Sequence, residues 1–258
     1  MRPLAALLAL ALPATAQVKV ERGSPDPQSV SWGPDPKAAV EKVFKPLLEH
    51  SGYDSSHWLK KEGRGATELL YTDKTHAIAG SPAVSLAAGT GPNKKDHAIV
   101  AVTYGLLDIV RDEDELAAIL GHEIAHLVLE HPQKMLADRM QAFDEWSAKQ
   151  DWGSFPSNDA AVAAFDRAHK ARFDKFQRGL EREADMHGQE LAALAGYDER
   201  AAGDALLHAK DWLWAMDAAE TPTHDPLKDR AARLHRLAAE RAERGANASA
   251  LADELGRQ

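Results

Sequence analysis

Five consecutive residues constrain this chain most: His122-Glu123-Ile124-Ala125-His126, an H-E-x-x-H sequence. Residues four apart on an α-helix lie on the same face, one turn from each other. Two imidazoles at this spacing can bind one metal ion, while the glutamate between them points toward a metal-bound water. H-E-x-x-H on a helix is a zinc metalloprotease motif with these roles. The alternative is two surface histidines that flank a solvated glutamate.

The surrounding residues predict a helix at about 112–131. Asp112 can cap its N-terminus, and Glu115 follows in a capping-box-like arrangement with further acids in the first turn. Pro132 limits continuation of the helix beyond His131. Such a helix would hold both histidines rigidly. Apolar residues at steps of three and four would face a core: Leu116, Ala117, Leu120, Ile124, Leu127 and Val128.

A catalytic zinc site normally takes three protein ligands, so a third is expected elsewhere. The sequence E-R-E-A-D at 181–185 lies in a helical pattern that runs from about 158 to 195 and ends at Gly196. Glu181 and Asp185 are four apart and face the same way. One carboxylate can bind zinc while the other accepts a hydrogen bond from a ligand imidazole. Glu183 points to another side of the helix and is the weaker candidate.

The motifs at 122–126 and 181–185 together resemble those of the gluzincin peptidases of the HtpX, BepA and CAAX prenyl protease family, metallopeptidase family forty-eight of clan MA. Further segments agree: Y-G-L-L at 104–107 before D-E-L-A-A at 114–118, A-G-Y-D at 195–198, and T-H-D-P at 223–226 with Arg230 beyond. The chain departs from the family pattern at Asp225, an inserted residue, and at 76–79, where H-A-I-A stands for the N-A-F-A of many relatives. The resemblance covers about residues 37–240.

With this resemblance we expect one Zn²⁺ per chain, bound by His122, His126 and Glu181, with Asp185 supporting a ligand imidazole. Glu123 would act as general base toward a water whose pKa the zinc lowers to about 7. The expected activity is that of a zinc metalloendopeptidase whose polypeptide substrate adds as a strand to an exposed sheet edge. The resemblance implies quality control of unfolded or misfolded envelope polypeptides, with outer-membrane assembly machinery as a possible partner.

Two other functions fit parts of this pattern. A non-proteolytic, chaperone-like binding protein could keep zinc as a structural element, but such a protein would lack the glutamate or fill the fourth metal position. Glu123 is present. A peptidase specialised for short peptides is compatible with the same motifs.

His224 has three possible roles. The resemblance implies a histidine near the metal, where a neutral imidazole could occupy the fourth zinc position and keep the enzyme latent. Its N–H could instead donate to the oxyanion and assist turnover directly. The third possibility is a cap for the helix that begins near Pro226, although Asp225 is the better cap.

The N-terminal residues predict an exported protein. Arg2 precedes an apolar run at 3–13, and A-T-A at 14–16 has the form of a signal-peptidase site, so we expect a signal peptide at 1–16. A buried amphipathic first helix is the alternative. Residues 17–36 are rich in Pro, Ser and Gly and predict a flexible leader. The chain has no cysteine, which excludes disulfides, thiolate metal ligands and a lipoprotein anchor. We expect a periplasmic or secreted bacterial protein, soluble after cleavage.

Composition narrows the partners. The formal net charge of −9 argues against nucleic acid or an anionic membrane surface as the main partner. No segment after the signal peptide approaches twenty uninterrupted apolar residues, so no stable membrane insertion is expected. Residues 37–258 would form one zinc metallopeptidase domain, and they show no tetratricopeptide repeat.

Periodicity predicts short strands near 66–72, 76–80, 83–88 and 97–103, after a helix at about 37–50. Further helices are expected at about 133–150, 158–195, 199–219 and 226–244. Because the strands precede most helices, we expect an α+β, helix-rich gluzincin domain with a small, mostly antiparallel sheet. Residues 133–157 look like an insertion whose Trp146, Trp152 and Phe155 could form a lid. Local packing of a helical hairpin is the alternative.

Overall fold

The computed structural model describes residue 32 and residues 36–52, 68–71, 84–88, 98–102, 104–107, 110–215 and 222–255. The predicted signal peptide at 1–16, the predicted strand at 76–80 and most of the leader at 17–36 lie outside these residues. One leader residue, Trp32, is described, and its indole nitrogen donates a hydrogen bond to the Leu107 carbonyl at 2.9 Å. At least this part of the leader therefore contacts the folded domain.

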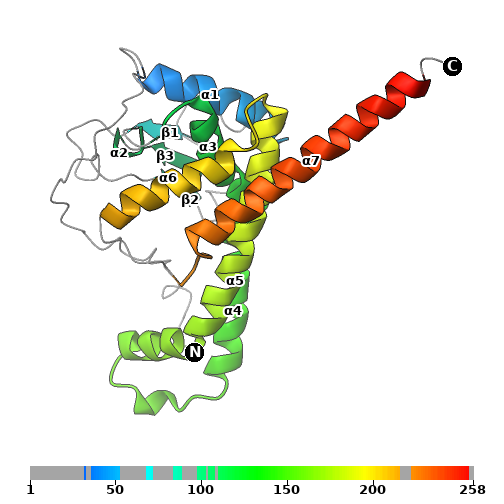
Figure 1. The fold of residues 1–258 in the computed structure, drawn as a ribbon. Coiled ribbons are helices and arrows are strands. Elements are labelled where there is room, and N and C mark those ends of the chain that lie inside the picture. The colour runs from blue at the N-terminus through cyan, green and yellow to red at the C-terminus, as the bar shows by residue number, and fades with distance from the viewer. Residues whose placement is uncertain are drawn as a thin grey trace.

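Most of the described residues are helical (Figure 1). The predicted helices begin and end within a few residues of their predicted positions in the described part of the chain, except that the last helix runs further. The short helix at 104–107 was not predicted. The helices are α1 (Pro36–His50), α2 (Tyr104–Leu107), α3 (Glu113–Val128), α4 (His131–Ser147), α5 (Asn158–Leu194), α6 (Ala201–Ala215) and α7 (Leu227–Leu255), with a short 3₁₀ turn, η3 (Trp152–Ser154).

The expected α+β class with a mostly antiparallel sheet is wrong. The described part of the chain is predominantly helical, and its three strands are short: β1 (Glu68–Tyr71), β2 (Val84–Ala88) and β3 (Ala98–Val102). β3 lies between the other two, parallel to β1 and antiparallel to β2, so the sheet is mixed. Alternating apolar residues mark a strand but do not specify the direction of its partner, which depends on how the connections cross.

Helix α3 forms the centre of the core. Leu116, Leu120 and Ile124 are fully buried, as the apolar stripe predicted. They pack with residues of α1, including Val43 and Leu47, and with the C-terminal end of α5. Burial of this stripe fixes the rotation of α3 about its axis, so the opposite face carries the histidines.

Two glycines let α3 and α5 cross at close range. A Cβ added at Gly121 would lie 2.7 Å from the Gly188 carbonyl oxygen, and one added at Gly188 would lie 2.5 Å from the His122 backbone nitrogen. Real Cβ atoms do not approach backbone atoms so closely, because van der Waals repulsion forbids it. This crossing brings the acidic residues of α5 next to the histidines of α3.

Local capping interactions fix the start of α3 and the end of α5. Asp112 accepts a hydrogen bond from the Glu115 amide at 2.8 Å, as expected of an N-cap, while the Glu115 carboxylate accepts from the Arg111 amide. At the end of α5, Gly196 has a φ of 90°, and the Tyr197 amide donates to the Ala192 carbonyl in a Schellman motif.

Helix α4 and the first part of α5 form a hairpin that projects from the rest of the domain (Figure 1). Trp146, Trp152 and Phe155 pack against one another, and Trp146 also contacts Phe165, with ring centroids 5.5 Å apart. Phe165 is 1% exposed, so the hairpin has a small aromatic core of its own. This arrangement favours local hairpin packing as the role of the three predicted lid aromatics.

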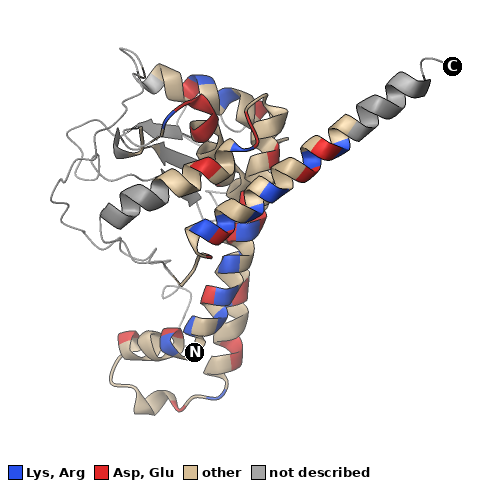
Figure 2. Cartoon of the chain, in the orientation of Figure 1, with Lys and Arg blue, Asp and Glu red and all other residues tan. Residues whose placement is uncertain are grey.

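Acidic and basic residues are interspersed along α5 and α7 (Figure 2). In the hairpin, Arg172 pairs with Asp138, and Arg139 pairs with Asp166.

Within the described ranges, no helix is long and apolar enough to cross a membrane.

Candidate metal centre

His122 and His126 lie one turn apart on α3, and their rings meet edge to face, with centroids 4.7 Å apart. The two Nε2 atoms are 3.1 Å apart. The side chains are 18% and 15% exposed, so solvent reaches them only in part. Two ring nitrogens at this separation can bind the same metal ion.

Glu181 on α5 completes a group of three. Its Oε2 lies 3.2 Å from His122 Nε2 and 3.7 Å from His126 Nε2. The three ligand atoms lie within 4.8 Å of one another and could hold a metal ion. Glu183, on the other side of α5, does not belong to this group and instead approaches His131 and Lys134.

The three donor atoms fit a tetrahedral metal ion. Ligand atoms at roughly 2.0–2.1 Å from zinc are about 3.3–3.4 Å apart along the edges of a tetrahedron, close to the observed separations. No described group makes a hydrogen bond of acceptable geometry to Glu181 Oε2, although this oxygen is buried. A buried carboxylate oxygen faced by imidazole nitrogens, without a proper hydrogen bond, is what a metal would satisfy.

The ring nitrogen of His122 that points away from Glu181 contacts a buried ion pair. Its Nδ1 lies 3.1 Å from Asp185 Oδ1, and Asp185 accepts hydrogen bonds from Arg230 at 2.6 and 2.9 Å. Asp185 and Arg230 are 5% and 7% exposed. Burial alone would raise the pKa of Asp185, but hydrogen bonds from His122 and Arg230 lower it below its ordinary value. The carboxylate therefore stays ionised and fixes the His122 ring.

Glu181 and His122 strongly influence each other's ionisation. Burial alone would raise the pKa of Glu181, but the facing imidazoles of His122, His126 and His224 lower it below its usual range. Burial alone would lower the pKa of His122, but Asp185 and Glu181 raise it to about 10. When no metal is bound, this shift favours the His122 ring with protons on both nitrogens at neutral pH.

The pKa of Glu123 is raised, whereas the pKa of Glu181 is lowered. Burial raises the pKa of Glu123 above its ordinary value, and the positive charges of His122 and His126 oppose this only in part. A carboxylate whose pKa is raised toward the working pH is a more effective general base.

His224 lies beside the same group, on the segment before α7. Its Nε2 is 3.1 Å from Glu181 Oε2, and Thr223 Oγ1 lies 3.0 Å from its Nδ1. The inserted residue Asp225 accepts two hydrogen bonds from Arg182, at 2.6 and 2.8 Å, and one from Arg233 at 3.1 Å. Asp225 therefore ties the His224 segment to both α5 and α7.

Sequence reasoning missed His131. It was expected only to end the zinc-motif helix, but it begins α4 and is fully buried. Its Nδ1 lies 2.9 Å from His126 Nδ1. Burial and the neighbouring His126 lower the pKa of His131 to about 4, although Glu183 opposes the shift. The only sequence signal was its position, five residues after His126.

Other described histidines make structural contacts away from the group. His187 lies near Glu190 on the same helix, and His235 pairs with Asp204. His208 pairs with the capping residue Glu115. The histidines at 57, 76 and 97 lie outside the described residues.

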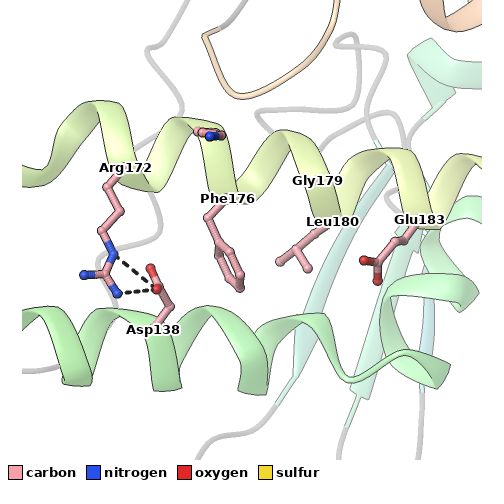
Figure 3. A pocket seen from close by; sticks show the side chains of 7 residues that line it. Asp138, Arg172, Phe176, Gly179, Leu180 and Glu183 are labelled. Atoms are coloured by element: carbon pink, nitrogen blue, oxygen red, sulfur yellow. Dashed lines mark hydrogen bonds and ion pairs between the residues drawn. The ribbon is translucent and has the colours of Figure 1, made fainter.

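A hollow of about 530 Å³ lies between α4 and α5, next to the metal-binding group but not lined by it. Figure 3 shows Phe176 and Leu180 pointing from α5 toward α4, with the Arg172–Asp138 pair at one end and Glu183 at the other. Glu183 links this hollow to the buried His131, which it approaches at 3.4 Å.

Comparison with known proteins agrees with this geometry. The chain is 36% identical over 108 residues to the mitochondrial metalloendopeptidase OMA1 of Bos taurus, a match that covers 40% of this chain and 21% of that protein. It is 46% identical over 78 residues to protease HtpX of Xanthomonas euvesicatoria, covering 26% of each. The matched part thus spans about a quarter or less of these relatives. No solved structure matches the chain significantly.

The model of Peptidase family M48 matches residues 65–238. This range contains α3, α5 and the start of α7, and with them every residue of the metal-binding group. M48 peptidases are metal-dependent, and zinc is their usual metal. The chain belongs to peptidase family M48.

Proposed function

We propose that this protein is a zinc-dependent metalloendopeptidase. The observation that carries the proposal is the convergence of His122, His126 and Glu181 from two helices, with Glu123 in the turn between the histidines. The names of the OMA1 and HtpX relatives, a metalloendopeptidase and a protease, support the same activity.

His122, His126 and Glu181 would hold one zinc ion per chain. When bound, zinc supplies Lewis acidity, which polarises the scissile carbonyl and makes water more acidic. Asp185 orients His122 through the bond to its Nδ1. Glu123 takes a proton from the attacking water and delivers it to the leaving amine.

An extended polypeptide is the substrate that suits this fold. In the described sheet β2 is an edge strand, and it lies against α3. A substrate strand that pairs with an exposed sheet edge uses its backbone for recognition, so side-chain selectivity is limited. This favours unfolded or misfolded chains over a single defined sequence.

The predicted signal peptide at 1–16 supports action in the bacterial periplasm or outside the cell. We infer a role in quality control of envelope polypeptides, with outer-membrane assembly machinery as a candidate partner. A chaperone-like protein with a structural zinc is the alternative function, and its distinguishing property would be zinc binding without cleavage.

The test of the proposal is cleavage of an unfolded substrate such as casein by the mature protein, with and without a chelator. Glu123→Gln should keep one zinc per chain and lose nearly all cleavage, because the ligands remain while the proton acceptor is gone. Full activity in Glu123→Gln would refute the mechanism. Zinc binding without any cleavage by the unaltered protein would favour the chaperone-like alternative.

His224 is proposed as a latent zinc ligand, since its Nε2 faces the same Glu181 oxygen as the other two imidazoles. Removal of a blocking ligand in His224→Ala should raise basal proteolysis. An oxyanion donor would instead give a loss of about 10²–10³-fold in kcat at preserved zinc content. Unchanged activity and zinc content would leave only a helix-capping role.

A further inference from the structure

Both nitrogens of the His126 ring have defined neighbours. Nε2 faces His122 and Glu181, whereas Nδ1 lies 2.9 Å from Nδ1 of His131. The His126 and His131 rings meet edge to face, with centroids 4.8 Å apart and planes inclined by 80°. This geometry directs one ring nitrogen of each histidine at the other.

Two facing nitrogens share a single proton, so one must donate and the other must accept. His126 can bind a metal through Nε2 only when its proton is on Nδ1. His131 Nδ1 is then the acceptor, and the His131 proton lies on Nε2, which faces Glu183 Oε2 at 3.4 Å. One direction of hydrogen bonding therefore runs from His126 through His131 to Glu183.

The backbone before His131 is specifically shaped. Glu130 has a φ of 55°, in the left-handed region that a residue with a Cβ rarely adopts. This turn ends α3 and begins α4 at once, with Pro132 in the first turn of α4. His131 is thereby turned inward, where it is 0% exposed.

We propose that His131 is a positioning residue for the metal centre, fixing the tautomer and ring orientation of His126 with Glu183 as its outer anchor. The inference rests on the proposed zinc site. The two ligand histidines then have different hydrogen-bond partners. The partner of His122 is the buried Asp185 carboxylate, which Arg230 holds, and the partner of His126 is the His131 imidazole.

The experiment compares His131→Asn, His131→Gln and His131→Phe. The Asn amide can place an oxygen where His131 Nδ1 lies, whereas the Gln amide reaches the position of Nε2 and leaves no acceptor at Nδ1. Zinc dissociation constants are measured by competition with a chromophoric chelator, and the thermal unfolding of the metal-free proteins is measured in parallel. His187→Asn, at a half-buried position of α5 away from the metal-binding group, is the matched control.

We expect zinc affinity to fall about 10–100-fold in His131→Gln and His131→Phe, the usual cost of losing a ligand's hydrogen-bond partner. His131→Asn should stay within a few-fold of the unaltered protein, and His187→Asn should match it. The visible spectrum of bound Co²⁺ should change in His131→Gln and be retained in His131→Asn.

Equal zinc affinity and equal Co²⁺ spectra in the Asn and Gln variants would overturn the assignment, and so would a weakening that only follows loss of thermal stability. These outcomes concern His131 alone. Failure of the unaltered protein to bind zinc would instead refute the proposed function.

Discussion

The two halves of α5 are stabilised by different interactions. The half that crosses α3 is tightly packed around Gly188, buries Glu181 and Asp185, and holds the latter with Arg230. The half in the hairpin packs aromatic rings around Phe165 and carries ion pairs that remain partly exposed. The first half buries charges that arginines compensate and that the proposed metal would compensate further, whereas the second half is stabilised by apolar burial and surface ion pairs.

The largest effect should come from filling the helix crossing. Gly188→Ala puts a Cβ 2.5–2.8 Å from backbone atoms of His122 and Gly121, so the helices must separate. We expect the free energy of unfolding to fall by about 3 kcal/mol and zinc affinity to fall with it. Urea unfolding and zinc competition would measure both.

Gly179→Ala is the matched control. Gly179 lies on the same helix, but a Cβ added there would meet no atom within 4 Å. It should stabilise the protein by about 0.5–1 kcal/mol through the higher helix propensity of alanine. Equal behaviour of the two variants would show that the close crossing is not required.

Next in size is the contrast between acids on opposite sides of α5. Glu181→Ala should lose zinc outright, whereas Glu183→Ala should retain it, because only Glu181 faces the two histidines. Asp185→Ala should weaken zinc affinity by about 10–100-fold. Metal analysis after dialysis would measure all three, and dispensable Glu181 beside indispensable Glu183 would contradict the site.

The dependence of zinc binding on pH should be smaller but graded. In the metal-free protein the pKa of His122 is raised to about 10, so a proton must leave before zinc binds. Apparent zinc affinity should rise about tenfold per pH unit between pH 7 and 9. Calorimetry in buffers of different ionisation enthalpy would detect the released proton, and its absence would contradict the prediction.

The raised pKa of His122 makes the stability of the metal-free protein depend on pH in the opposite direction from zinc binding. A pKa above the unfolded value of 6.5 stabilises the folded state fully below that pH, and the contribution is lost as the pH rises toward 10. The metal-free protein should therefore unfold more easily at pH 9 than at pH 7, while zinc binds more tightly.

The smallest effect is expected in the hairpin. Arg172→Gln breaks the pair with Asp138, but the arginine side chain is 36% exposed and water screens the interaction. Stability should change by no more than about 1 kcal/mol, with zinc affinity unchanged. A large loss of zinc in this variant would show that the two halves of α5 are coupled.

Helix positions could be predicted because their signals are local. Asp112 and Gly196 mark helix ends through their own conformational preferences, and the apolar stripe on α3 predicts its buried face. The direction of strand pairing could not be predicted, because it depends on connections between segments distant in the chain. The inserted Asp225 looked like a departure from the family pattern, and its pairing with Arg182 became apparent only in three dimensions.

By itself, the sequence determined which residues share a helix face: His122 with His126, and Glu181 with Asp185. Helical geometry repeats within a few residues, so no knowledge of the fold was needed. The tertiary structure alone decided how closely the two faces approach, through the contact of Gly121 with Gly188. It also decided that His131 turns inward behind His126, because side-chain contacts between helices depend on how the chain turns between them and not on spacing alone.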